Sequence, residues 1–341
     1  MSEPLVIRAP GKLFLLGEYA VLDGCPAVVA AVDRHVEVRL VRTGPRSPIR
    51  IEAPGVNARA EFAAEAVPIA RGPLAFALSA FRSASEHLTG LLASGLNIAI
   101  ASNLADVSGT KTGLGSSAAV SVAMVAALFA AAGKNLRDVA VRDQIFSVAL
   151  TAHRATQTGV GSGADVAASC YGGVVFFEPS ASGPRVRPLI LPEDARLLVG
   201  WTGTPASTAS LVQRYLAARN GAAAKRTAFV RESRACVAAF VEALDRGTLS
   251  RTALNGNGEA IAQLGAALDL PLVTPSLHTL VALARQHGAG AKPSGAGGGD
   301  CGIALTQESD AAARICSVWR EAGILPLDIH LDREGVRLAG A

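Results

Sequence analysis

Apolar and polar residues follow two different periods along this chain, and each period predicts a different kind of element. Short apolar runs, some alternating with polar residues and bounded by Gly, Pro or Asp, predict strands at 13–16, 26–32, 36–40, 96–100, 173–177, 196–201, 302–305 and 327–331. Apolar positions at helical spacing predict helices at 74–92, 116–132, 137–155, 205–219, 224–246, 250–267, 274–287 and 308–322, and a further short helix begins at 165. Each half of the chain then forms helices over a mostly antiparallel sheet, which is an α+β class of fold.

One stretch of the chain separates the two halves. Residues 179–188 are rich in Pro, Gly and Ser, which is typical of a linker. The 341 residues also suit two domains of roughly 150 residues each. We therefore expect an N-terminal domain over residues 1–183 and a C-terminal domain over residues 184–341.

The composition narrows the class of protein. Half of the residues are hydrophobic and the net charge is +4, with no stripe of Lys and Arg, so nucleic acid is not expected as a partner. The most apolar stretch, 118–132, is shorter than the roughly 20 residues that span a bilayer, and residues 1–12 lack a signal-peptide pattern. The five cysteines are scattered without a CxxC spacing, which predicts neither disulfides nor a zinc site. We expect a soluble cytoplasmic protein without membrane contact, either a monomer or a homodimer.

The segment KTGLGSSAA at 111–119 is the main candidate for chemistry, because it leads directly into a predicted helix. The N-terminus of a helix leaves unpaired backbone N–H groups and the positive end of the helix dipole, which together favour an anion. Gly113 and Gly115 lack the Cβ atoms that would keep a phosphate from the backbone, and Ser116 and Ser117 add hydroxyl groups. The alternative is a serine N-cap on a buried helix, with the glycines forming an ordinary turn.

A single lysine, Lys12, directly precedes the apolar run 13–16. We expect its ammonium group to lie near the end of a strand, half desolvated and in need of an anion, because an unpaired buried charge is costly. Glu18 or a substrate oxygen would supply that anion. A solvated lysine at the edge of a strand is the alternative.

Asp165 follows the glycine- and serine-rich turn at 161–164 and opens a short predicted helix. In that place a carboxylate is suited to accept a proton from an attacking hydroxyl, with a nearby Lys12 to stabilise the transferring group. Taken alone, Asp165 is equally well explained as a helix cap. No Ser/His/Asp triad is predicted, and His153 and His287 are interpreted as exposed or satisfied residues at helix ends.

A second glycine-rich segment follows Lys292. Five glycines among residues 295–302 make a loop that offers little steric barrier to a ligand approaching its backbone. Because ordering so much glycine is entropically expensive, a passive connector is a poor explanation. A flexible hinge remains the alternative.

In this order along the chain, from Ala9 to about Val336, these segments resemble the GHMP kinases, a family that includes galactokinase, homoserine kinase, mevalonate kinase and phosphomevalonate kinase. The resemblance implies an N-terminal half like ribosomal protein S5 domain 2, a ferredoxin-like C-terminal half and an active site between them. It implies ATP and Mg²⁺ as cofactors, with a phosphate cradle made of Gly113, Leu114, Gly115, Ser116 and Ser117. Ser117 would ligate the metal, and Lys111 would reach phosphate oxygens of ATP.

Within the family, the segments GSGADVAASCYGG, WTGTPAST and KPSGAGGGDCGIAL resemble the phosphomevalonate branch, which implies phosphomevalonate as substrate. Lys12 and Asp165 would then form the phosphoryl-transfer pair, and the loop 294–299 would close over the phosphates. The substrate-binding residues that the resemblance implies are Lys12, Tyr19, Ser162, Ser207, Thr208, Ser294, Gly295 and Ala296.

One position departs from the mevalonate kinases, which carry a Mg²⁺-binding Glu eleven residues before the catalytic Asp. That position is Arg154 here, with Gln157 nearby, and the change suits an acceptor that already bears a phosphate. Arg8, Arg154 and Arg214 are candidates for gripping the distal phosphate. The alternative functions are a mevalonate kinase, an enzyme like diphosphomevalonate decarboxylase and a non-catalytic sensor that binds ATP.

Overall fold

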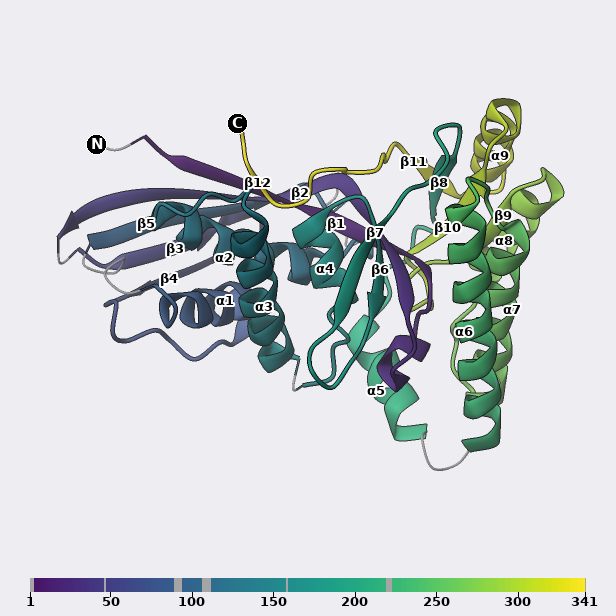
Figure 1. Ribbon diagram of the computed structural model, residues 1–341, viewed down its shortest axis with the longest axis horizontal. Helices are drawn as coiled ribbons and strands as arrows, with labels where there is room; N and C mark the ends of the chain where they lie inside the picture. Colours follow the sequence, from purple (N-terminus) through teal and green to yellow (C-terminus); the bar gives the residue numbers. More distant parts are fainter. Residues whose placement is uncertain are drawn as a thin grey trace.

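The structure is a computed structural model that describes residues 3–45, 47–88, 94–105, 112–157, 159–218 and 223–340. The molecule is elongated, with a large sheet and its helices at one end and a smaller sheet with long helices at the other (Figure 1). The predicted α+β class, with helices over mostly antiparallel sheets, is confirmed. No helix among the described residues is both long and apolar enough to cross a membrane.

The larger sheet has the strand order β12-β1-β2-β5-β3-β4, and the β6–β7 pair joins it through β2. Its strands are β1 (Leu5–Leu16), β2 (Ala27–Pro45), β3 (Ile49–Ala53), β4 (Ala58–Phe62), β5 (Ser94–Ser102), β6 (Val174–Glu178), β7 (Arg185–Leu189) and β12 (Arg337–Leu338). Only β3 and β5 pair in parallel; the other described pairs of this sheet are antiparallel. Short 3-10 helices lie at η1 (Ala20–Asp23), η2 (Pro54–Val56) and η3 (Gly72–Leu74).

The first two strands are longer than the sequence predicted. The three apolar runs expected near the N-terminus belong to just two strands: the first lies in β1, and the other two lie in β2, which continues through both because a register shift opposite Pro10/Gly11 absorbs the residues between Val32 and His35. A shift of this kind absorbs an irregular residue without ending the strand. Lys12 therefore lies inside β1, and its predicted place near a strand end is wrong.

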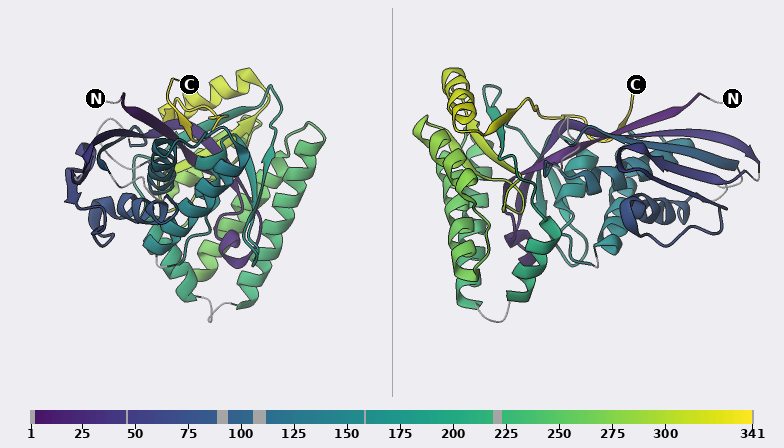
Figure 2. Two further views of the ribbon diagram at one scale, coloured as in Figure 1. Left: turned by 60° about the vertical axis from the view of Figure 1, so that its left-hand side comes forward. Right: turned by 180° about the vertical axis from the view of Figure 1, so that it is seen from behind.

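Four helices cover one face of the larger sheet: α1 (Ala75–Ser85), α2 (Ser116–Ala131), α3 (Val139–Thr156) and α4 (Ala164–Tyr171). The views in Figure 2 show the same layer from two other sides. In β2, Val36, Val38 and Leu40 are buried while Arg39 is exposed, as expected for a sheet with one covered face. α2 is apolar around almost its whole circumference because it is enclosed by β1, β2, α1, α3 and α4.

The smaller sheet has the order β11-β8-β10-β9 and is antiparallel throughout. It consists of β8 (Arg196–Trp201), β9 (Gly290–Pro293), β10 (Cys301–Thr306) and β11 (Leu325–Leu327), and the helices of this half are α5 (Thr208–Ala217), α6 (Ala223–Asp245), α7 (Arg251–Leu268), α8 (Pro275–Gln286) and α9 (Ser309–Glu321). Ala304 of β10 packs with Trp319 under α8 and α9, whereas Ile303 packs into the core shared with the larger sheet. This alternation follows from the two-residue period of a strand.

Several element bounds differ from the sequence prediction. α1 ends at Ser85 instead of residue 92, and residues 89–93 lie outside the described part. β7 occupies residues that were predicted as a linker, and β12 pairs with β1 although it belongs to the last residues of the chain. The division into domains at 183/184 stays a prediction.

Candidate active site

Lys12 lies at the centre of the site that the structure assembles. Lys12 is only 9% exposed, and both its backbone N–H and its ammonium group bind the glycine-rich loop that precedes α2. The backbone N–H of Lys12 donates to the carbonyl oxygen of Leu114 at 2.8 Å, and its Nζ donates to that of Gly113 at 3.1 Å. The ring of Phe14 lies 5.5 Å from the ammonium nitrogen. Strand β1 thus places a positive charge directly beside the predicted phosphate loop.

The first turn of α2 presents backbone donors beside this lysine. Gly115 is the N-cap with φ 82°, and no described side chain caps the helix. The first intrahelical bond runs from Ala119 to Gly115, so the N–H groups of the three preceding residues are the open donors of the helix end. A Cβ at Gly115 would lie 2.8 Å from Cε of Lys12, so this position requires glycine. The turn therefore offers a cradle for an anion against Lys12.

Asp300 closes the other side of the loop. A Cβ at Gly113 would lie 2.6 Å from a carboxylate oxygen of Asp300, so these two residues are in direct contact. Asp300 is buried with φ 52°, and its Oδ1 accepts from the backbone N–H of Ala206 at 2.9 Å. Its own N–H donates to Thr204. The sequence reasoning did not single out Asp300, although it is the residue that ties three loops together.

Asp165 is held by a histidine. It lies in the first turn of α4, which packs against β1 and α2, and its side chain is 20% exposed. Its Oδ2 lies 3.7 Å from Nε2 of His153, and the same ring nitrogen lies 3.3 Å from Oγ of Ser117. Within the described residues, no ion pair joins Lys12 to Asp165. The structure therefore places the predicted pair on adjoining elements, with Asp165 turned toward His153.

The interpretation of His153 as an exposed or satisfied helix-end residue is wrong. Its side chain is 1% exposed, and its Nδ1 has no hydrogen-bond partner among the described residues. His153 comes eight residues after Ile145 and four after Ala149, which are both fully buried on α3. That helical spacing would have placed the histidine on the inward face.

The guanidinium group of Arg154, the next residue, bonds to backbone carbonyl groups of the turn before α4. Its guanidinium donates to the carbonyl oxygens of Gly161 at 3.2 Å and Ser162 at 2.8 Å. Oγ of Ser162 in turn accepts from the N–H of Ala164 at 3.3 Å, which closes the turn before α4. Arg154 thus fixes the turn that carries Asp165.

The second glycine-rich segment is anchored by a buried ion pair. Nζ of Lys292, on β9, donates to Glu18 and to the carbonyl oxygen of Pro293, and both side chains of the pair are almost fully buried. Desolvation lowers the pKa of Lys292, and the Glu18 carboxylate opposes that shift. Glu18 also accepts from the N–H of Gly295 at 3.3 Å. Glu18 is therefore committed to Lys292, and a substrate oxygen remains the predicted anion for Lys12.

The glycine-rich loop that follows Lys292 also contacts β1 and the segment after β1. These contacts are made by Ser294, Ala296 and Tyr19. Oγ of Ser294 donates to the carbonyl oxygen of Phe14 at 2.9 Å, and the hydroxyl of Tyr19 donates to that of Ala296. Burial, and then the nearby Glu18 charge, raise the pKa of Tyr19, which keeps this hydroxyl protonated. Gly295 lies beside Lys12, since a Cβ there would be 3.9 Å from Nζ. These residues form the wall opposite α2.

Ser207 and Thr208 stand at the start of α5, where both are exposed and Ser207 caps the helix through Ser210. This turn adjoins the loop because Ala206 bonds to Asp300. Of the two other candidates for the distal phosphate, Arg8 pairs with Glu37 on the sheet, and Arg214 donates to the carbonyl oxygen of Asp269.

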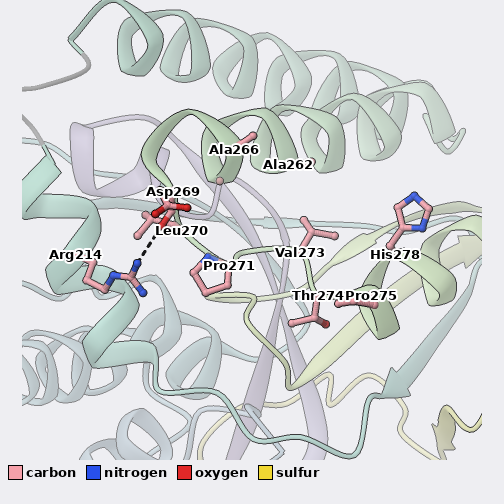
Figure 3. A pocket seen from close by; sticks show the side chains of 11 residues that line it. Arg214, Ala262, Ala266, Asp269, Leu270, Pro271, Val273, Thr274, Pro275 and His278 are labelled. Atoms are coloured by element: carbon pink, nitrogen blue, oxygen red, sulfur yellow. Dashed lines mark hydrogen bonds between the residues drawn. The ribbon is translucent and has the colours of Figure 1, made fainter.

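Figure 3 shows Arg214 at a pocket between α5, α7 and α8, and none of the other residues that line it was predicted to bind substrate or ATP. Lys111 lies outside the described residues, so its predicted contact with ATP is not described.

The oxygen donors in the site suit Mg²⁺. The hydroxyl of Ser117 and the carboxylate of Asp165 both adjoin His153, and Mg²⁺ usually takes one or two protein oxygens together with phosphates and water. Within the described residues there is no group of three or more His, Cys, Asp and Glu side chains able to enclose a metal.

Comparison with known proteins places the chain in a family. Residues 75–173 match the family model described as GHMP kinases N terminal domain, and residues 240–325 match GHMP kinases C terminal. A phosphomevalonate kinase of Streptomyces sp. (strain CL190) is 36% identical, over 97% of this chain and 98% of that protein. The chain belongs to the GHMP kinases. It is therefore an ATP-dependent phosphotransferase, and the predicted two-domain GHMP kinase fold is confirmed.

Other GHMP kinases match along their whole length. A mevalonate kinase of Thermococcus sibiricus is 28% identical, over 98% of both chains. The crystal structure of a Lin0012 protein from Listeria innocua has a TM-score of 0.88 at 26% identity, covering 99% of this chain and 100% of that one. Streptococcus pneumoniae phosphomevalonate kinase, solved with phosphomevalonate and AMPPNP, has a TM-score of 0.78 at 23% identity, covering 96% and 99%. The latter likeness concerns the fold alone.

Proposed function

We propose that this GHMP kinase transfers the γ-phosphoryl group of ATP to the 5-phosphate of (R)-5-phosphomevalonate, giving 5-diphosphomevalonate and ADP. The charge balance of the site carries the proposal. Lys12 and the N-terminus of α2 are positive, Asp165 and Asp300 are the carboxylates described beside them, and Arg154 stands where the mevalonate kinases carry a metal-binding Glu. An acceptor that brings its own phosphate supplies the missing negative charge. The 36% identity to a phosphomevalonate kinase supports the same acceptor.

The phosphates of ATP would bind along residues 113–117, where open N–H groups point away from α2. Ser117 and Asp165 would hold Mg²⁺, which would neutralise negative charge on the phosphates. Because Lys12 is fixed by Gly113 and Leu114, its ammonium needs little reorganisation to meet the transferring group. Positioning and fixed charge supply most of the rate in such transfers.

The transfer itself is a direct in-line displacement. An oxygen of the acceptor's 5-phosphate forms a bond to the γ-phosphorus while the bond from that phosphorus to the β,γ-bridging oxygen breaks and ADP leaves. A phosphate is already largely deprotonated at pH 7, so the acceptor does not need a strong base. Asp165 then serves to orient the acceptor, and Tyr19, Ser162, Ser207, Thr208 and the loop 294–296 would line its pocket.

A coupled assay of ADP release tests this proposal, with phosphomevalonate, mevalonate and diphosphomevalonate as acceptors and CO₂ release measured in parallel. The expected result is ADP release with phosphomevalonate at a kcat/KM at least tenfold above that with mevalonate, without CO₂. Faster turnover of mevalonate would identify a mevalonate kinase, and CO₂ from diphosphomevalonate a decarboxylase. ATP binding without turnover of any acceptor would identify a sensor.

Several predictions remain open beside this one. The contact of Lys111 with ATP, the cytoplasmic location and the choice between monomer and homodimer stay predictions. Mass measurement in solution decides the last of these directly.

A further inference from the structure

We propose that His153 is a positioning residue of this kinase: its buried ring, with Nε2 facing both Asp165 and Ser117, keeps that carboxylate and that hydroxyl in the orientation that the transfer requires. The inference rests on the proposed function only for the choice of substrate in its kinetic test. Three observations carry it, namely the enclosure of the ring, the atoms around Nε2 and the direction of Arg154.

The ring of His153 is locked in place. It is 1% exposed, and the ring of Phe76 from α1 lies against it at 5.1 Å with an interplanar angle of 31°. One turn away on the same face of α1, Oγ of Ser79 donates to the carbonyl oxygen of Ala152 at 2.8 Å. A side chain held by packing and by a fixed helix is able to orient its partners.

The surroundings of the ring decide where its proton lies. Nε2 faces Oδ2 of Asp165 at 3.7 Å and Oγ of Ser117 at 3.3 Å, and a carboxylate only accepts hydrogen bonds. Nδ1 is buried without a partner among the described residues, so a proton there would be an unsatisfied donor. The tautomer with hydrogen on Nε2 is therefore favoured. The side-chain nitrogen of Gln157 lies 3.5 Å from the same ring nitrogen, at the limit of a hydrogen bond.

The place of His153 explains how the site works without a Glu at position 154. Arg154 donates to the carbonyl oxygens of residues 161 and 162, so its side chain does not enter the space between α2 and α4. His153 fills that space instead and contacts the side chains of both helices. Where a Glu would add an anionic oxygen, the imidazole adds a donor that restrains Asp165.

Three substitutions separate this role from a merely structural one. His153→Gln places an amide N–H near the position of Nε2, His153→Asn reaches only the position of Nδ1, and His153→Phe keeps an aromatic ring against Phe76 without a donor. We expect His153→Phe and His153→Asn to lower kcat for phosphomevalonate about 10- to 100-fold, the range known for residues that orient ligand groups. His153→Gln should retain kcat within a few-fold of the wild type. His287→Phe, at the C-cap that follows α8, is the matched control and should leave kcat unchanged.

Two further readouts do not depend on turnover. Calorimetry with ADP in the absence of Mg²⁺ should give Kd values within about threefold of the wild type for all variants, because Lys12 and the backbone N–H groups of the first turn of α2 hold the phosphates in that case. Nitrogen-15 NMR of labelled histidine should show hydrogen on Nε2 of His153. A proton on Nδ1 alone, or equal kcat losses in the Gln, Asn and Phe variants, would overturn the proposal. Failure of the wild type to use phosphomevalonate would instead overturn the proposed function and leave the NMR result interpretable.

Discussion

Lys12 reaches the phosphate loop because the backbone next to it carries no side chains. The stem of the lysine passes so close to Gly115 that a methyl group there would overlap it, and its ammonium bonds to Gly113. The position of Lys12 therefore depends on the glycines of the loop, and a side chain at Gly115 would displace the lysine.

Replacement of Lys12 with Met should separate binding from transfer. Met keeps most of the buried stem but loses the charge that faces the transferring group. We expect kcat to fall by about 10²–10³, as when one fixed donor is removed from a transition state, while the Kd for ATP changes little. Single-turnover kinetics and ATP titration measure the two effects. A Lys12→Met enzyme with wild-type kcat would show that the lysine has no part in the transfer.

Gly115 and Gly133 offer a matched pair of glycines. Both have φ near 80°, but a Cβ at Gly133 meets nothing within 4 Å, whereas one at Gly115 meets Lys12. Alanine costs about 1–2 kcal/mol of folding free energy at either position because of the left-handed backbone. Gly115→Ala should in addition lower kcat at least tenfold by displacing the lysine. Urea unfolding and steady-state kinetics on both variants test this, and equal activity of the two would contradict it.

Elements with a strong local pattern could be predicted from the sequence, and those that depend on distant partners could not. The apolar residues of α2 and β10 are sufficient by themselves to predict buried elements. β7 carries mostly exposed residues, including two Arg and a Pro, and becomes a strand only because β6 pairs with it. The C-terminal segment likewise gains its structure from contacts with β1 and β2.

The same limit applies to the site. The motifs around Lys12, Gly113–Ser117 and Asp165 could be recognised in the sequence because glycines, serines and charged residues lie close together there. His153 faces Ser117 across 36 residues, and Asp300 supports Gly113 across a longer separation. Pairing of this kind depends on how helices and loops pack, and a single sequence does not contain that information in local form.

Asp332 fastens the C-terminal segment to the larger sheet. Burial alone would raise its pKa, but hydrogen bonds from His35, Arg337 and the N–H of Gly335 outweigh burial and hold the pKa at about 2, against an ordinary value of 3.8. The ionised form therefore stabilises the fold above about pH 4, and this stabilisation is lost as the pH falls from about 4 to 2. The shift corresponds to about 2 kcal/mol at neutral pH.

Asp332→Asn tests this fastening. We expect the variant to lose about 2 kcal/mol of unfolding free energy at pH 7, and the gap from the wild type to narrow as the pH approaches 2. Urea denaturation at several pH values measures both. Asp328→Asn, whose side chain is 92% exposed, is the control and should show neither effect. A gap that is constant from pH 7 to 3 would mean that the Asp332 charge is not responsible.

Across the whole molecule, the segment that follows β1 joins the two halves. Glu18 binds Lys292 on β9, and the hydroxyl of Tyr19 binds Ala296 in the glycine-rich loop. Asp23 of η1 binds Arg226 on α6 and Tyr215 on α5. A short stretch of the N-terminal half therefore fixes the position of the C-terminal sheet, the loop and two helices.

The Glu18–Lys292 pair should be costly to break on one side. Glu18→Gln or Lys292→Met leaves a buried charge without its partner, which typically lowers unfolding free energy by about 3–5 kcal/mol. The double variant removes both charges and should lose less than the sum of the single variants, as measured by chemical denaturation. Glu61→Gln, in an exposed pair with Arg50, is the control and should have little effect. Simple additivity of the two buried substitutions would refute the coupling.

The pairing of β12 with β1 has a consequence for biosynthesis. A ribosome makes β1 among the first residues and β12 among the last, so the edge of β1 stays open until nearly the whole chain has emerged. At about 5–20 residues per second, that interval is at least roughly 15 s. An open strand edge is a template for pairing with other chains. During translation, the β1 edge of a nascent chain is therefore exposed to pairing with other chains for this interval.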